Sequence, residues 1–303
     1  MTPRRRERRS LPSLIAFVVI TALAVGIPVA ATGAPTLGPT GGLWERITGR
    51  LPEARGGREA VIRADTLRAF RLDRQGMSAA LERAPRELTR AAEADPLELS
   101  LPAPGGGFQR FEVQESPVME PGLAALHPHI TTYGGRGIDD PIATIRLDLT
   151  PAGFHASVRG AEGSWYIDPY YHLDQSTYAS YFARDLTDTH GTFVERGMEA
   201  LERDAERLEA GAPGDTEALR SSGDQLRTYR LALVTDQTYG TYHGANTDPN
   251  LVTAAKATLV NRLTQIYEAE TSIRLVMVAG TDQLNLNTDA LAIQPNGPCG
   301  GAA

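Results

Sequence analysis

Histidine can act as a general base or a metal ligand near neutral pH, and the chain has six histidines. They are His127, His129, His155, His172, His190 and His243. None belongs to an H-E-x-x-H motif, and no two lie four residues apart on a predicted helix. His127 and His129 are the only close pair. Pro128 between them prevents a helix, so the sequence predicts a surface loop there. His155 falls in an alternating stretch and is interpreted as an ordinary strand residue.

Other catalytic motifs are missing from the sequence as well. There is no G-x-S-x-G, no P-loop and no dinucleotide-binding glycine motif. Asp139 and Asp140 could form a paired-carboxylate site, but Pro141 follows them, and Asp-Asp-Pro is typical of a turn. The glycine-rich stretches 105–107 and 134–137 are interpreted as turns between strands. The one cysteine, Cys299, cannot form a disulfide or a thiolate metal site by itself. Together with the missing motifs, this means that the sequence predicts no catalytic and no metal-binding residue.

Aromatic residues gather in one short stretch. Half of the ten tyrosines fall within 165–181, next to a tryptophan. Trp165, Tyr166, Tyr170 and Tyr171 could form an aromatic platform for a sugar or a peptide. Packing between strands of a β domain is the other interpretation, and the pattern favours it.

The first 31 residues have the features of an export signal. Five arginines form a basic head, an apolar stretch covers 14–25, and small residues precede a plausible cleavage site after Ala31. Removing the net +4 of residues 1–31 from the formal charge of −7 would leave −11. An acidic chain argues against nucleic-acid binding. We therefore expect a secreted protein with no stable membrane span after cleavage. An uncleaved N-terminal anchor is the alternative, because the apolar stretch becomes long enough if 27–31 are counted.

The region that follows is expected to be an antiparallel β domain. Residues 32–59 are interpreted as a flexible lead-in, and 60–190 as the β-rich domain. Period-two alternation predicts strands at 67–72, 97–101, 108–113, 143–149, 154–158 and 165–167. The turn residues at 102–107 make 97–113 a predicted hairpin, and a short helix is expected over 76–83.

The last third of the chain changes character. Residues 191–226 are expected to be a linker helix and loop. The helix carries one apolar stripe at 4-3-4-3 spacing, made by Val194, Met198, Leu201, Ala205 and Leu208. Residues 227–235 and 273–279 are predicted strands. A helix that begins at Asp248-Pro249 separates them. Val252, Leu259, Leu263 and Ile266 should form its apolar stripe.

Strand, helix and strand in this order predict a βαβ unit with parallel strands in 227–303. Two parallel strands alone would leave their edges without partners, so we expect this unit to be poorly stable. The sequence thus predicts an α+β protein, with a mostly antiparallel domain followed by an incomplete α/β unit.

Several stretches together resemble the precursors of bacterial reprolysin-like zinc metallopeptidases. Four resemble the propeptide: 115–121 (ESPVMEP), 133–141 (YGGRGIDDP), 148–156 (DLTPAGFHA) and 165–170 (WYIDPY). Others resemble the start of the catalytic domain: 227–233 (RTYRLAL), 260–262 with 266–268, 273–276 (IRLV), 282–283 and 286–289. The resemblance runs from about residue 60 to the C-terminus.

This resemblance implies a metzincin fold and hydrolysis of protein or peptide substrates by zinc-activated water. The family's H-E-x-x-H-x-x-G-x-x-H motif does not occur here, so no zinc ligand and no catalytic base carries over. The implied protein is a secreted precursor fragment that binds no zinc and is inactive alone. Cys299 would pair with a cysteine outside this sequence, and no cysteine in 32–226 could hold the zinc for latency. The alternative is an exported, non-catalytic binding protein that uses the aromatic cluster.

Overall fold

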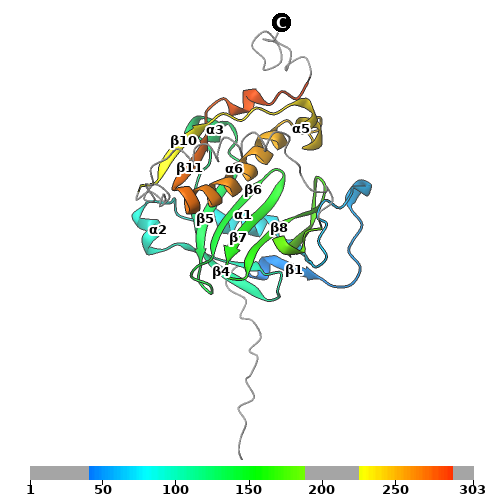
Figure 1. Cartoon of the computed structure of the whole chain (residues 1–303). Coiled ribbons are helices and arrows are strands. Elements are labelled where there is room, and N and C mark those ends of the chain that lie inside the picture. The colour runs from blue at the N-terminus through cyan, green and yellow to red at the C-terminus, as the bar shows by residue number, and fades with distance from the viewer. Residues whose placement is uncertain (1–40, 188–224, 289–303) are drawn as a thin grey trace, which may run out of the picture. The chain divides into compact units, whose positions relative to one another are not determined.

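A computed structural model describes residues 41–187 and 225–288 (Figure 1). The predicted signal sequence with Ala31, the linker helix at 193–210 and Cys299 lie outside the described residues. The described chain combines helices and sheet, and an antiparallel sheet of nine strands dominates it. No helix among the described residues is long and apolar enough to cross a membrane.

The sheet has the order β1-β2-β9-β8-β7-β6-β5-β4-β3, and every neighbouring pair is antiparallel. Its strands are β1 (Trp44–Ile47), β2 (Arg68–Leu72), β3 (Leu97–Pro102), β4 (Phe108–Glu115), β5 (Thr131–Gly137), β6 (Thr144–Thr150), β7 (Gly153–Gly160), β8 (Gly163–Tyr171) and β9 (Asp174–Phe182). The sheet curls so that its two sides meet, where Arg68 Nε donates to Pro104 O at 2.7 Å and Ser180 Oγ donates to Pro102 O at 2.8 Å. These bonds join the β2–β9 side of the sheet to the end of β3.

The inner face of the curl holds the main hydrophobic core. Alternate residues of the strands point into it, as period-two patterning requires. Helix α1 (Arg74–Leu81) adds Met77 and Leu81, and its first turn is capped by the Asp73 carboxylate, which accepts from Gly76 N at 3.0 Å. The fully buried members include Leu99, Leu101, Phe111, Val113, Phe154, Val158 and Ile167. The hairpin predicted over 97–113 is confirmed, with Leu97 opposite Val113 and Pro102 opposite Phe108.

The structure differs from the prediction in three strands. Strand β1 lies within the expected lead-in, because Trp44 is buried in the core and its ring packs edge-on against Phe154. Strand β5 includes the glycines 134–137, which the sequence analysis interpreted as a turn. Strand β9 was not predicted; both of its faces are largely buried, so it lacks the polar alternation that marks a half-exposed strand.

The glycines of β5 are required by close backbone approach rather than by turning. A Cβ on Gly135 would lie 2.1 Å from Glu112 O, and one on Gly137 would lie 2.1 Å from Asp140 O. A side chain at either position would collide with the backbone. These two glycines are therefore strand residues at places where another backbone segment approaches closely. The turn predicted around Asp139 and Asp140 does follow, between β5 and β6.

The C-terminal part contains the predicted βαβ arrangement. Strands β10 (Arg227–Leu231) and β11 (Ile273–Met277) pair in parallel, with α5 (Gln237–Tyr242) and α6 (Asn250–Thr271) between them in sequence. The parallel pairing is confirmed. Helix α6 also packs against the outer face of the large sheet at β6, as Figure 1 shows.

The edge of β11 has a partner, contrary to the expectation of an unpaired strand. Met277 N donates to Val118 O at 2.8 Å, and Glu120 N donates to Met277 O at 2.9 Å. This short parallel bridge pairs Met119 with Met277. The chain then enters α3 (Pro121–Leu126), and the remaining short helix, α2 (Arg90–Ala94), precedes β3. Residues 118–120 thus make an isolated parallel bridge to the edge of β11.

Candidate functional site at the contact between the sheet and helix α6

Five of the nine buried residues of helix α6 are polar, namely Thr253, Lys256, Asn261, Thr264 and Gln265. Asn261 and Gln265 bind the sheet, whereas Thr253 and Lys256 bind the segments that follow β10 and β11. Strand β6 is buried on both faces. Its residues Ile145 and Leu147 belong to the core, whereas Arg146 and Asp148 alternate with them and face α6. Buried polar groups need partners, and specific hydrogen bonds and ion pairs hold α6 alongside the apolar contacts of Ala254, Ala257 and Val260.

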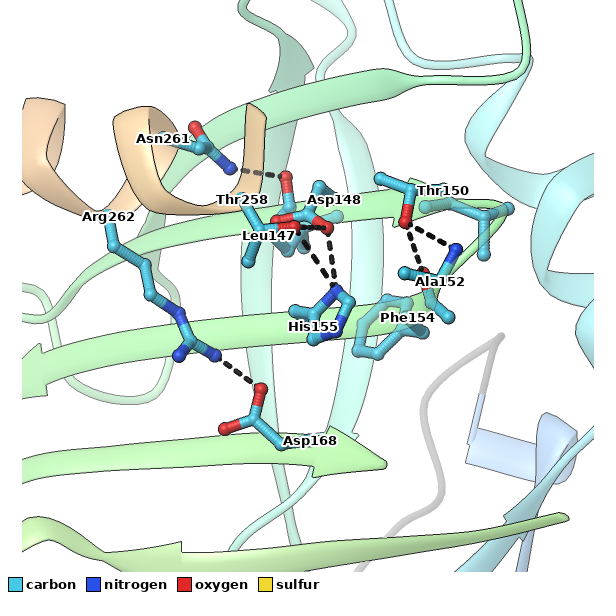
Figure 2. Close-up of polar contacts among 12 residues, drawn as sticks. Leu147, Asp148, Thr150, Ala152, Phe154, His155, Asp168, Thr258, Asn261 and Arg262 are labelled. Carbon is cyan, nitrogen blue, oxygen red and sulfur yellow. Dashed lines mark hydrogen bonds and ion pairs between the residues drawn. The ribbon is translucent and has the colours of Figure 1, made fainter. Parts of the chain in front are cut away.

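An aspartate, a histidine and a threonine lie at the centre of the contact between α6 and the sheet (Figure 2). Asp148 and His155 are opposite each other in the β6–β7 hairpin, and Asp148 Oδ1 lies 2.8 Å from His155 Nδ1. Thr258 Oγ1 of α6 donates to the same carboxylate oxygen at 2.9 Å. The side chains of Asp148 and His155 are only 2% and 14% exposed. A single buried carboxylate therefore joins the hairpin to the helix.

This group has the residue types of a hydrolytic triad but not its geometry. A triad needs the hydroxyl and the carboxylate on opposite nitrogens of the imidazole. Here Thr258 Oγ1 lies 3.4 Å from His155 Nδ1, the nitrogen that also meets Asp148, and its proton goes to the carboxylate. The arrangement holds the helix on the sheet and does not activate the threonine hydroxyl.

A second buried carboxylate, Asp168 of β8, pairs with Arg262 of α6 (Figure 2). Tyr181 Oη donates to the other oxygen of Asp168 at 2.7 Å. Burial raises the pKa of Tyr181, and the neighbouring Asp168 charge raises it further. Burial alone would lower the pKa of Arg262, but the charges of Asp168, Tyr181 and Asp148 and the hydrogen bond with Asp168 together raise it. Both shifts keep the hydroxyl protonated and the guanidinium charged, so the contact persists at neutral pH.

Two amide side chains of α6 bind the backbone of the sheet. Asn261 Nδ2 donates to Leu147 O at 2.9 Å, as Figure 2 shows. Gln265 Nε2 donates to Thr144 O at 3.0 Å, and Gln265 Oε1 accepts from Ser157 Oγ at 2.7 Å. Because these bonds require exact alignment of donor and acceptor, they fix the position of the helix along β6.

An ion-pair network continues toward the C-terminal end of α6. Arg146 of β6 pairs with Glu268 and donates to Ser116 Oγ at 2.6 Å. Arg274 of β11 also pairs with Glu268, and it donates to the Glu87 carboxylate at 2.6 and 3.0 Å. Charges on the large sheet side therefore face opposite charges on the βαβ unit.

Glu120 anchors the 118–120 segment to the βαβ unit. Its carboxylate accepts from Arg230 Nε at 2.5 Å and from Ala279 N at 2.9 Å. The hydrogen bond from Arg230, followed by the one from Ala279, lowers the pKa of Glu120. The adjacent Val118 and Met119 are buried against Met277 in a second, smaller core.

Lys256 is a fully buried cation in α6. Its Nζ donates to Leu233 O at 2.6 Å and to Thr281 O at 3.3 Å, so it ties together the segments that follow β10 and β11. Burial lowers the pKa of Lys256 from 10.5 to about 8. The unfolded chain thus binds more protons between these two values, and stability should rise with pH across that window.

This shift leads to a first prediction, on the variant Lys256→Met. From pH 8 to about 9.5, the free energy of unfolding of the unmodified chain should rise by about 1–2 kcal/mol through this group. The variant should lose that rise, whatever its stability at pH 8. Urea denaturation at several pH values measures both profiles. Parallel profiles would show that Lys256 does not titrate in this window.

The four aromatic residues singled out from the sequence do not form a common platform. Trp165 is 4% exposed and belongs to the main core, whereas Tyr166 lies on the other face of β8, with the Arg262 guanidinium 5.3 Å from its ring centre. Tyr170 and Tyr171 pack edge to face, and Tyr171 Oη donates to Pro52 O at 2.5 Å. The four aromatic residues do not share one face.

The described part of the chain does not fit a zinc site. No group of three or more His, Cys, Asp or Glu in 41–187 and 225–288 is arranged to hold a metal ion. His127 lies at the end of α3 with Asp282 3.6 Å away, and His155 pairs with Asp148. The pair of Asp148 and His155 was not predicted from the sequence. The two residues flank the turn 150–153, and this placement indicates that they can lie opposite each other in a hairpin.

In comparisons with known proteins, no family model and no curated protein matches this chain.

Proposed function

We propose that this chain is the precursor region of a secreted zinc metalloendopeptidase. In this proposal the nine-stranded domain is the propeptide, and the βαβ unit is the start of the catalytic domain. The resemblance of both regions to reprolysin-like precursors supports the assignment. The change from an antiparallel sheet to a parallel βαβ unit, at the point where the resemblance changes from propeptide to catalytic domain, also supports it.

The observation that carries the proposal is the polar contact between these two parts. A stable domain core is apolar, whereas interfaces that must separate are more polar. Here two buried carboxylates, Asp148 and Asp168, and two amides, Asn261 and Gln265, join α6 to the sheet. Residues 118–120 pair with the edge of β11 at Met277. A propeptide that supports the first elements of the catalytic domain and later separates from them needs a polar contact with α6 and a partner for β11.

The proposal assigns no zinc ligand to this chain, because the described residues do not fit one and the sequence has no H-E-x-x-H motif. The purified chain is therefore expected to hold no stoichiometric zinc and to hydrolyse no peptide. Metal analysis and a peptide hydrolysis assay measure this. Stoichiometric zinc with activity that a chelator removes would contradict it. Reading the gene past codon 303 tests the family itself, since the zinc motif should follow in one frame.

A cleavage experiment tests the propeptide role directly. A recognition site for a sequence-specific protease is placed within 211–224 of the full chain, which is then cut and analysed by size-exclusion chromatography. Because the contacts are made between groups on both sides of the cut, the two pieces should elute together at neutral pH. The uncut chain is the control. Pieces that elute apart without denaturant would overturn the proposal.

A further inference from the structure

The short helix α5 contacts the large sheet where strand β8 turns into β9. A Cβ on Gly244, which follows α5, would lie 2.9 Å from Leu173 Cδ1 in that turn. His172 Nε2 lies 2.7 Å from Tyr242 O, and the centres of the two rings are 4.6 Å apart. Because a carbonyl oxygen only accepts, His172 Nε2 carries the hydrogen and donates. One histidine of the sheet therefore holds the end of α5.

A second histidine, His243, directly follows α5 and is half-buried among aromatic rings. Its ring centre lies 4.3 Å from that of Tyr239 and 5.0 Å from that of Tyr242. The backbone N–H of His243 donates to Tyr239 O at 3.0 Å, which fixes the residue against the helix. Protonation of His243 would place a charge where these rings exclude water.

His243 has no counter-ion at this contact. Within 41–187 and 225–288, no ion pair joins it to a carboxylate. The acidic residues nearest to it in sequence, Asp236 and Asp248, each accept from a backbone N–H at the start of their own helix. A proton on His243 is therefore not balanced by a bound negative charge.

The titratable groups that face His243 from the sheet are also histidines. They are His172 of the β8–β9 turn and His155 of β7, and histidines gain positive charge in the same pH range. Burial lowers the pKa of His243, and the charges of His172 and His155 lower it further. His155 pairs with Asp148, so its own proton is balanced by a carboxylate.

The surroundings of His172 add positive charge to the contact. His172 lines a cavity of about 440 Å³ together with Arg58, Glu59 and Arg63. The Arg58 guanidinium also donates to His172 O at 3.5 Å. A proton on His172 thus meets two guanidinium groups and one carboxylate, which disfavours the charged form.

We propose that the contact between α5 and the sheet is a pH switch, which holds while His243 and His172 are neutral and loosens when they are protonated. Unfolded His243 binds its proton near pH 6.5, and the folded chain binds it only at lower pH. The contact is therefore fully stable above that pH and weakens as the pH falls through it. In the proposed precursor, acid would help the βαβ unit to separate from the sheet. The switch itself goes beyond that function and does not depend on it.

Hydrogen–deuterium exchange in the full chain tests the switch. The reporters are the amides of Gly240 and Ala245, which donate to Asp236 O at 3.0 Å and to Gly240 O at 2.9 Å. Mass spectrometry measures their exchange at about pH 7.5 and about pH 5.5, on either side of the histidine range. All chains are compared at the same pH, so the pH dependence of the chemical exchange cancels.

Three variants are compared with the unmodified chain. His243→Phe and His172→Phe keep an aromatic ring at the contact but cannot be protonated there. His129→Gln is the matched control, because His129 is an exposed histidine that takes no part in the contact.

Protection of the two amides in the unmodified chain should fall about three- to tenfold on acidification, relative to His243→Phe, since one proton changes an equilibrium at most about tenfold per pH unit. His172→Phe should show a smaller fall, and His129→Gln should follow the unmodified chain. Equal losses in the unmodified chain and either phenylalanine variant would overturn the proposal. Protection that rises on acidification would also overturn it, because the tyrosine rings would then stabilise the charged histidine.

Discussion

The variant Gly135→Ala is expected to lose about 3 kcal/mol or more of folding free energy. The added Cβ would lie 2.1 Å from Glu112 O and 3.2 Å from Ile145 Cγ2. Glu112 O belongs to β4, the strand that pairs with β5, so it can move only if that pairing is distorted. The variant therefore destabilises the centre of the sheet and not an exposed turn.

Urea denaturation followed by tryptophan fluorescence measures this loss, because Trp44 and Trp165 are both buried in the main core. Gly42→Ala is the matched control, since no atom lies within 4 Å of a Cβ there and its φ is not positive. The control should change the free energy of unfolding by less than about 0.5 kcal/mol. Equal midpoints for the two variants would show that β5 tolerates a side chain at Gly135.

Gly135 also shows which part of the fold could not be predicted from the sequence. Strands that alternate between core and outer face, such as β6 and the β3–β4 hairpin, could be predicted from period-two patterning. The glycines of β5 indicate a turn when read locally, because glycine is rare inside strands. Their actual cause is the approach of Glu112 O, which depends on a neighbouring strand and cannot be read from local sequence.

The candidate site was less predictable than the fold. Apolar spacing in α6 correctly predicted a helix, but it did not indicate which side faces the sheet. The residues that decide this, Asn261 and Gln265, bind backbone carbonyl groups of β6 and β7, and such partners leave no pattern in the sequence. Asp148 and His155 become a pair only through the register of their hairpin.

The variant Asp168→Ala should be the most disruptive change in the contact between the sheet and α6. It leaves the Arg262 guanidinium without its carboxylate and the buried Tyr181 hydroxyl without its acceptor. Removing one partner of a buried ion pair costs about 3–5 kcal/mol. The Arg262 side chain is 31% exposed, so water screens part of that loss, and we expect about 2–3 kcal/mol.

The matched control for this variant is Glu270→Ala, which removes another ion pair between α6 and the sheet, with Arg159 of β7. The Arg159–Glu270 pair is 37% and 57% exposed, and its loss should cost less than about 1 kcal/mol. Urea denaturation gives both values, and the cleaved chain gives a second measurement, because Asp168→Ala should release the 225–303 piece while Glu270→Ala retains it. If both variants behave alike, buried charge does not hold α6 on the sheet. The apolar contacts around Met277 would then carry the docking, and a polar, separable interface could no longer support a propeptide role.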